Sequence, residues 1–410
     1  MDAEMQGSQA RWFLTPTSFP WKMERGWGRS IFSLFCLVAL TLSGCAQLKA
    51  LAGGGTTASL PTFQVGIVGA ALGPGGVEGS YSANGAQLAM DAINAQGGVV
   101  WQGQHYQLTP TFSGASAVVD RVRDFTSRIP PIVALLGPDE SDAAVAALPL
   151  IASTRIPTLT LALDDTLTDS AKNQQALSLF RVRPPQAAWA QALATYAMQH
   201  ANGPIALASI DNDYGHTGAA TLITALAAAK VTPVAQITLP AGMDDASQQV
   251  NAIKAAHANT VLCWSTEAEA ATLLHALHAA SWQGQFLLGQ ADADFIALAG
   301  PDGDGVLGLQ SWSPALTDVA SQAFVAAYTH RFGTAPDDHA AAMYDAVHLL
   351  AAGLASVGPD HDALTHYLAT LSGYNGVTGL YTASQQGNLT TTLHLMLIQH
   401  GAVTDVATLG

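Results

Sequence analysis

Short apolar runs alternate along the chain with segments in which apolar residues recur at helical spacing. Runs of four to seven residues bounded by Gly, Pro, Asn or Asp, such as 205–210 and 260–264, predict buried strands. The segment 186–199 places Trp189, Leu193 and Tyr196 on one helical face. Strands that alternate with such helices indicate parallel sheets covered by helices on both faces.

The stretch 65–98 is the clearest unit of this kind. It reads as a strand, a glycine-rich turn and an amphipathic helix, and in parallel sheets ligands bind beyond the carboxyl ends of the strands. A dinucleotide fingerprint starting at Gly73 would need glycine where Glu78 stands. A phosphate-binding P-loop is excluded because the stretch contains no lysine.

Length and composition allow two α/β lobes with sizeable cores. The chain has 410 residues, of which 49% are hydrophobic and 11% charged. Its formal net charge is −15, and no basic cluster follows Cys45, so nucleic acid is excluded as a partner. Composition indicates no cofactor.

The N-terminus predicts a targeting segment and an anchor. Arg25 and Arg29 precede an apolar run at 31–42 that is too short to span a membrane. The run ends in Leu42-Ser43-Gly44-Cys45, which resembles a bacterial lipobox. We expect residues 1–44 to be a signal peptide, Cys45 to carry lipid, and 45–61 to be a tether on the periplasmic side of the membrane.

Cysteine usage agrees with this assignment. Cys36 leaves with the signal and Cys45 carries lipid, so Cys263 alone remains in the mature domain. An intramolecular disulfide is therefore impossible there. Its apolar surroundings predict that Cys263 is a buried core residue rather than a nucleophile.

Several motifs resemble one family and follow its order. They are Gly73-Pro74, Asn84-Gly85-Ala86, Ile93-Asn94-Ala95 with Gly97-Gly98, Pro336 with Met343-Tyr344-Asp345-Ala346, and the segment 374–388. Together they resemble the type I periplasmic binding proteins, in the leucine/isoleucine/valine-binding branch of ABC-transporter receptors.

The resemblance implies two doubly wound, Rossmann-like α/β lobes joined by three crossovers. Lobe I would comprise 62–181 and 311–375, and lobe II 182–310 and 376–410. The lobes would close on a small polar ligand, an amino acid or a related amide or carboxylate, and deliver it to an ABC permease. No catalytic motif is present, so the chain is not expected to be an enzyme.

The resemblance also implies ligand-binding residues on lobe I. Ser141 and nearby backbone groups would hold a ligand carboxylate at a helix N-terminus, although Ser141 also fits the N-cap of that helix. Ala162 would offer a backbone contact. Asp164 stands where relatives carry a hydroxyl, and there it would face a ligand carboxylate as a second anion.

On lobe II the implied residues follow three strands. Tyr214, in the strand–Tyr-Gly–helix turn, would line the cleft, together with Thr266 and Glu267. Asp292 would contact a ligand ammonium group, although Ala291 occupies the nominal position.

Two histidines at helical spacing could present metal ligands on one face. His275 and His278 lie at i, i+3 on a predicted helix without a third metal ligand nearby in sequence, so we expect an exposed helix face and no bound metal.

The alternative function is that of an outer-membrane lipoprotein of the same fold that activates a peptidoglycan synthase, a penicillin-binding protein. A cleft with polar residues from both lobes favours a solute receptor, whereas a filled cleft favours this protein-binding alternative.

Overall fold

The computed structural model describes residues 59–68, 80–113, 117–168 and 178–409. The predicted signal peptide, Cys45, most of the predicted tether and the glycine-rich turn before residue 80 lie outside the described residues.

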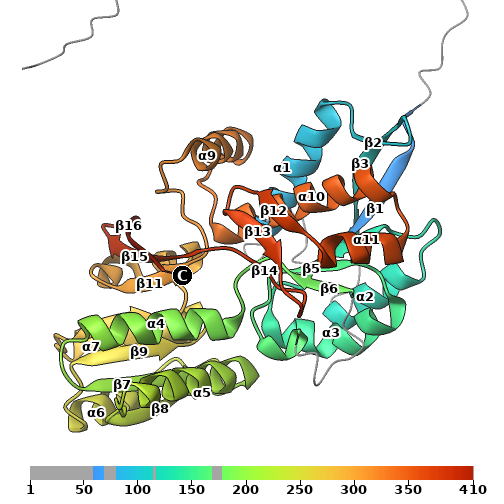
Figure 1. Ribbon diagram of the computed structural model, residues 1–410. Helices are drawn as coiled ribbons and strands as arrows, with labels where there is room; N and C mark the ends of the chain where they lie inside the picture. The colour runs from blue at the N-terminus through green and yellow to red at the C-terminus, as the bar shows by residue number, and fades with distance from the viewer. Residues whose placement is uncertain (1–58, 69–79, 114–116, 169–177, 410) are drawn as a thin grey trace, which may run out of the picture. The chain divides into compact units, whose positions relative to one another are not determined.

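The first lobe is built on a six-stranded sheet with the order β2-β3-β1-β4-β5-β6, parallel except for the β2–β3 pair (Figure 1). The strands are β1 Thr62–Ile67, β2 Val99–Trp101, β3 Gln104–Phe112, β4 Ala134–Leu136, β5 Thr158–Thr160 and β6 Leu179–Arg181. One face packs against α1 (Ser80–Ala95), α10 (Asp338–Val357) and α11 (His361–Ala369), and the other against α2 (Val118–Thr126) and α3 (Ser141–Thr154). Successive residues of β4 alternate between the two cores, as the period of a strand requires.

Helix α10 packs on one face of this sheet against both α1 and α11. Among the described helices it alone has the length and composition of a membrane span, and 61% of that stretch is buried within the protein. A further helix, α9 (Val319–Phe332), packs on α1 and α10 through Phe324 and Tyr328.

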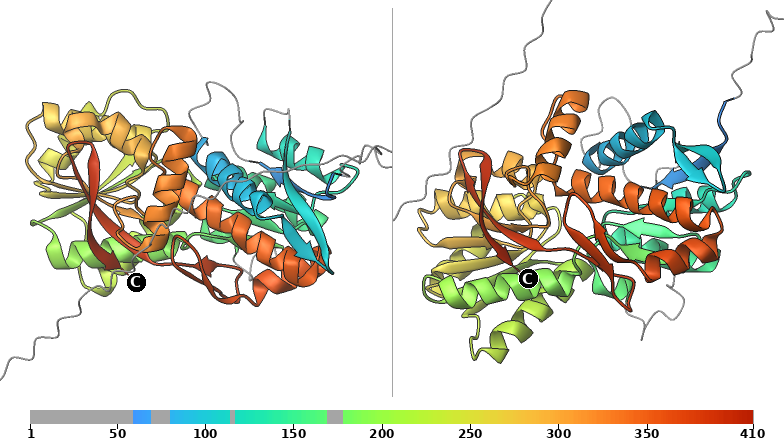
Figure 2. Two further views of the ribbon diagram at one scale, coloured as in Figure 1. Left: turned by 90° about the horizontal axis from the view of Figure 1, so that it is seen from above. Right: turned by 45° about the horizontal axis from the view of Figure 1, so that its top comes forward.

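The second lobe is built on a seven-stranded sheet with the order β16-β15-β11-β10-β9-β7-β8. Its parallel strands are β7 Ile205–Ile210, β8 Ala235–Leu239, β9 Thr260–Trp264, β10 Gln285–Leu288 and β11 Leu307–Gln310. Two antiparallel strands, β15 (Leu393–Gln399) and β16 (Ala402–Leu409), complete it, drawn in red beside the second lobe in Figure 2.

Helices cover both faces of this sheet as well. On one side lie α4 (Gln186–His200) and α5 (Asp213–Ala228), and on the other α6 (Ser247–Ala255), α7 (Glu267–Ala279) and α8 (Ala293–Ala299). Cys263 is fully buried in the second of these cores, as predicted. The fold class expected from the sequence, two doubly wound α/β lobes, is confirmed.

The third crossing between the lobes differs from the expected boundary at 375/376. Strands β12 (Ser372–Asn375), β13 (Leu380–Ala383) and β14 (Leu389–Thr390) form a small antiparallel sheet. Tyr381 and Leu389 lie in the first lobe's core, and Asn388 bridges to Arg181 at the edge of the first sheet. The chain therefore crosses only at 391–392, because Tyr381 and Leu389 anchor the preceding segment in the first lobe's core.

Candidate functional site

A cavity of about 320 Å³ lies where strand ends of the two sheets meet. From the first lobe it is lined by the start of α3, by the segment after β5 and by His339, and Arg183 lines it from the first crossing between the lobes. From the second lobe it is lined by residues that follow β7, β9 and β10. The carboxyl ends of parallel strands are where α/β sheets bind ligands, so this cavity is the candidate site.

The N-terminus of α3 forms one wall. Its N-cap is Glu140, which makes no side-chain cap hydrogen bond, so Ser141 is the first helical residue and the N-cap interpretation of Ser141 is wrong. The Ser141 Oγ accepts hydrogen bonds from the backbone N–H groups of Leu163 and Asp164, each at 3.2 Å. Its own hydrogen remains to donate, and the first backbone N–H groups of the helix have no intrahelical partner.

Two predicted residues of the first lobe point elsewhere. Ala162 is buried in the core, and its carbonyl accepts from Arg181 Nε at 2.9 Å. The Asp164 carboxylate accepts from Thr166 N at 2.7 Å and from Thr166 Oγ1 at 2.6 Å, capping the short helix η1 (Asp165–Leu167). Neither residue lines the cavity, and the conflict expected between Asp164 and a ligand anion is removed.

Tyr214 lines the second-lobe wall, as the sequence predicted. Its hydroxyl accepts a hydrogen bond from Gln290 Nε2 at 3.1 Å, and its ring lies 5.6 Å from that of Trp264. Burial raises the pKa of Tyr214 far above the ordinary value, so the phenol stays neutral and its O–H group can donate a hydrogen bond. Glycine follows the tyrosine because a Cβ on Gly215 would lie 1.8 Å from the Ile210 carbonyl oxygen.

The turn after β9 brings Thr266 and Glu267 to the cavity. Thr266 is the N-cap of α7, and its hydroxyl donates to the Glu269 carboxylate, which also accepts from Gly242 N at 2.7 Å. The single hydroxyl hydrogen of Thr266 is therefore already used. Glu267 lies in the first turn of α7 and lines the cavity.

Asp292 lies behind Glu267 rather than on the cavity wall. Its carboxylate caps α8 by accepting from Phe295 N at 2.9 Å. Burial, together with the charge and hydrogen bond of Glu267, raises the pKa of Asp292 well above its ordinary value. The two carboxyl groups therefore form a hydrogen-bonded pair behind the cavity wall.

A buried network around Arg183, which the sequence did not predict, lies beside these residues. This buried guanidinium donates to Asp338 Oδ2 at 2.7 Å and to Gln290 Oε1 at 3.0 Å, and its Nη1 lies 3.0 Å from His339 Nε2. Burial opposes a charge on Asp338, but Arg183 outweighs it and holds the pKa of that carboxyl well below its usual range. Arg183 sits in the segment Phe180-Arg-Val-Arg183-Pro-Pro, where only the buried ion pair identifies its role.

Two clusters of metal-ligand type lie in the described residues. Asp337, Asp338 and His339 bring donor atoms within 4.8 Å of one another, but Asp337 caps α10 and Asp338 is paired with Arg183. His275 and His278 of α7 both reach Asp302, with Nδ1–carboxylate distances of 2.7 and 3.1 Å, at an exposed face. This face of α7 is exposed, as expected, and both histidines contact Asp302, a partner that their spacing did not indicate.

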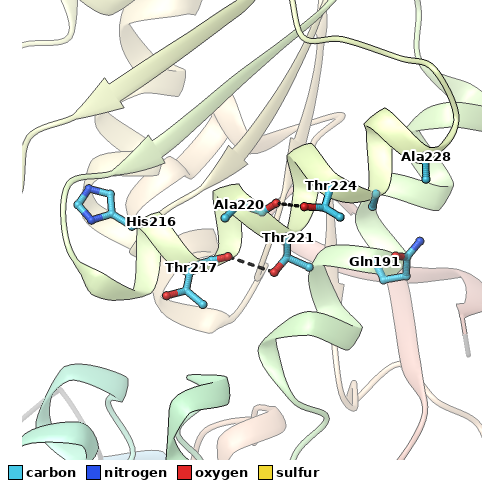
Figure 3. A pocket seen from close by; sticks show the side chains of 8 residues that line it. Gln191, His216, Thr217, Ala220, Thr221, Thr224 and Ala228 are labelled. Carbon is cyan, nitrogen blue, oxygen red and sulfur yellow. Dashed lines mark hydrogen bonds between the residues drawn. The ribbon is translucent and has the colours of Figure 1, made fainter. Parts of the chain in front are cut away.

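A larger hollow of about 630 Å³ lies on the second lobe between α4 and α5 (Figure 3). Its hydroxyls are used by their own helix, since Thr221 donates to the Thr217 carbonyl at 3.1 Å and Thr224 to the Ala220 carbonyl at 2.8 Å. It is open to solvent, and all of its lining residues belong to one lobe. The smaller cavity between the strand ends is lined by polar and charged residues from both lobes, and it is therefore the better candidate for a ligand site.

Comparison with known proteins agrees with this placement. A family model for periplasmic binding proteins matches residues 62–402, and no curated protein matches the chain. The isoleucine complex of LivJ, the branched-chain amino acid transporter substrate binding protein of Streptococcus pneumoniae, is 21% identical with a TM-score of 0.74, covering 85% of this chain and 99% of that chain. LivK, a leucine binding protein of Thermotoga maritima, is 16% identical with the same TM-score and coverage.

An ABC-transporter solute binding protein of R. palustris in complex with benzoate is also similar. It is 19% identical with a TM-score of 0.71, covering 85% of this chain and 96% of that chain. At these identities the structures establish the fold, and the family model spans both lobes. The chain therefore belongs to the periplasmic binding proteins, in their type I form.

Proposed function

We propose that this chain is the solute-binding component of an ABC transporter and acts outside the cytoplasm. It would hold a small polar molecule between its lobes and pass it to a permease. The observation that carries the proposal is the cavity itself, which combines Ser141 and the start of α3 with Tyr214 and Glu267 from the other lobe. A ligand that contacts both lobes stabilises their closed arrangement by its differential affinity.

The comparisons support a transport role of this kind. The similar proteins of S. pneumoniae and R. palustris carry isoleucine and benzoate, so the fold serves ligands of different chemistry. The ligand of this chain must then follow from its own side chains.

The lipid anchor is part of the proposal and rests on the sequence. The lipobox ending at Cys45 and the tether 45–61 would hold the receptor at the membrane, near a permease. The protein-binding alternative expects apolar or filled cleft positions. The hydroxyl, carboxyl and amide groups that line the cavity support the receptor instead.

The test is a thermal-shift screen of the full chain in detergent against amino acids, amides, amines and short carboxylates. A compound that binds only the folded state at 100 times its Kd stabilises it by about 2.7 kcal/mol, which raises the melting temperature by several degrees. Tyr214→Phe and Ser141→Ala should each weaken a hit about tenfold, because each removes one hydrogen-bonding hydroxyl.

Thr224→Ala is the matched control, since that hydroxyl lies in the α4–α5 hollow and not in the cavity. It should leave the affinity unchanged. If no compound shifts the melting temperature of a cooperatively folded sample, the receptor proposal fails.

A further inference from the structure

The side chain of Tyr214 is held in the cavity wall by three contacts. Its ring lies 5.6 Å from that of Trp264, its backbone carbonyl accepts from Gln186 Nε2 at 2.6 Å, and its hydroxyl oxygen lies 3.1 Å from Gln290 Nε2. A phenol can donate a hydrogen bond or accept one, and its role toward a ligand decides what the ligand must carry. Gln290 settles which role remains.

Arg183 fixes the orientation of the Gln290 amide. Its Nη2 donates to the amide at 3.0 Å and to Asp338 Oδ2 at 2.7 Å. A guanidinium has N–H donors and no acceptor, so the amide atom that faces it has to be the oxygen. The ion pair keeps the guanidinium in place, because the side chains of Arg183 and Asp338 are each only 2% exposed.

The orientation of the amide in turn fixes the role of the phenol. The Gln290 nitrogen faces Tyr214 and can only donate, so the phenol oxygen accepts. Burial raises the pKa of Tyr214, so that oxygen also keeps its hydrogen. The described residues offer no acceptor to this hydrogen, and Tyr214 lines the cavity. The hydrogen is therefore available to a ligand.

The Ser141 hydroxyl of the first lobe is fixed in the same sense. Its oxygen accepts from the backbone N–H groups of Leu163 and Asp164, which occupy both lone pairs, so it too offers only a hydrogen. The Thr266 hydroxyl, by contrast, already donates to Glu269. Two hydroxyl groups, one from each lobe, thus present donors to the same cavity.

We propose that Gln290 is a positioning residue that makes Tyr214 an obligatory donor, so that the cleft selects a ligand with a hydrogen-bond acceptor at this point. The acceptor is a carbonyl, carboxylate or ether oxygen, or a ring nitrogen without a hydrogen. An ammonium group placed there would direct its hydrogens against the hydrogen of the phenol. The assignment rests on the proposed receptor function and names the residue that sets the polarity of its site.

The test changes the chemistry of the relay and keeps its length. In Gln290→Glu both side-chain oxygens accept, one from Arg183 and the other from Tyr214, so the phenol hydrogen turns away from the ligand. Gln290→Met removes the amide without adding charge, and it leaves the phenol hydrogen free to turn toward a ligand. Tyr214→Phe is then made in wild type and in each of these two variants.

Binding of isoleucine, isovaleramide and benzoate to the full chain in detergent is measured by calorimetry and thermal shift. Tyr214→Phe should weaken the compounds that bind about tenfold in wild type and in Gln290→Met, but less than about twofold in Gln290→Glu. The charge added by Gln290→Glu acts with or without the phenol, so it cancels from this comparison. Gln283→Glu, exposed at the other end of β10, is the matched control and should keep the tenfold effect.

A spectroscopic readout tests the relay without a ligand. The Raman Fermi doublet of tyrosine distinguishes a phenol that donates to a carboxylate from one that accepts. Subtracting the spectrum of Tyr214→Phe in each background isolates Tyr214 from the other tyrosines. The doublet should change from the accepting to the donating form in Gln290→Glu and stay unchanged in Gln283→Glu. The melting temperature without ligand reports whether each variant folds.

The outcomes separate the relay from the receptor function. Equal losses on Tyr214→Phe in all backgrounds, or a doublet that Gln290→Glu leaves unchanged, would overturn the relay and leave the receptor function standing. Binding that Tyr214→Phe does not weaken in wild type would overturn the donor role of the phenol. A screen in which only simple amines bind would overturn the requirement for an acceptor. Absence of any binding would overturn the receptor function, and the doublet would still decide the relay.

Discussion

Gly85 determines how closely two helices approach at the scale of a single residue. It lies in α1, and a Cβ built there would stand 2.1 Å from the carbonyl oxygen of Ala340 in α10. The obstacle is backbone and cannot rotate away. The family resemblance of Asn84-Gly85-Ala86 thus has a physical basis, because α1 and α10 pack through this point.

Gly85→Ala should therefore destabilise the protein although alanine favours helix by up to about 1 kcal/mol. Overpacking against backbone costs more than that gain, so we expect a net loss of about 1–3 kcal/mol in the free energy of unfolding. Urea unfolding followed by circular dichroism measures it. Gln87→Ala, two residues along α1, is the control and should change stability by no more than about 0.5 kcal/mol. Equal stability of Gly85→Ala and wild type would show that α10 moves aside.

Residues that line the cavity could be predicted from the sequence where they follow a predicted strand. Ser141, Tyr214 and Glu267 follow buried strands, and all three line the cavity. Asp164 was misplaced because its carboxylate bonds within its own turn, a local competition that sequence spacing does not reveal. Arg183 and Gln290 were missed because their role depends on a contact between segments more than 100 residues apart.

At the scale of elements, α10 holds the small sheet through Asp345. This buried carboxylate accepts from the backbone N–H groups of Val377 and Thr378, both at 2.8 Å, and from the Tyr381 hydroxyl at 3.2 Å. Burial raises the pKa of Asp345 to about 6, and these hydrogen bonds limit the rise. One side chain therefore couples a helix to the segment that precedes the third crossing.

The raised pKa predicts a pH dependence of stability. The folded pKa of Asp345, about 6, exceeds the ordinary 3.8, so the protonated carboxyl group stabilises the folded state. This contribution to the free energy of unfolding is complete below pH 3.8 and is lost as pH rises through 6. The loss corresponds to about 3 kcal/mol across that window. Asp345→Asn removes this slope, so the stability of wild type relative to the variant should fall from pH 4 to pH 6.

Urea unfolding at several pH values measures this difference. Asp120→Asn, on the exposed face of α2, serves as the control and should track wild type at every pH. A constant difference between wild type and Asp345→Asn would contradict a raised pKa at this site.

Elements were predicted best where the pattern was uninterrupted. The strands at 205–210 and 260–264 have the predicted bounds. The run at 389–397 keeps the period-two pattern of a single strand, yet the structure divides it into β14 and β15 with the crossing between them. Alternation is a local property and continues through the break, so it could not indicate that the two halves belong to different sheets.

At the scale of the whole molecule, Arg183 joins the lobes at a buried ion pair. Asp338 begins α10 of the first lobe, Gln290 follows β10 of the second, and Arg183 lies on the first crossing between them. Its guanidinium also lies 5.0 Å from the ring centroid of Trp189 in α4. Such a pair is costly to break from one side, because the other charge stays buried.

Asp338→Asn should accordingly lower the free energy of unfolding by about 3–5 kcal/mol, since it leaves Arg183 without its carboxylate. The double variant Asp338→Leu with Arg183→Met removes both charges and should cost less. A double-mutant cycle by urea unfolding measures the coupling between the two residues. Additive losses in the cycle would mean that the ion pair contributes nothing beyond its separate side chains.

The late position of β15 and β16 has a consequence for how a nascent chain reaches this structure. Strand β11 finds its outer neighbour only after all of α9 to β14 has been made, and those elements belong to the other lobe. Until then the second sheet ends in an unpaired strand, a template for association with other chains. A vectorially emerging chain thus completes its first lobe before its second, and needs protection at the edge of β11 during the interval.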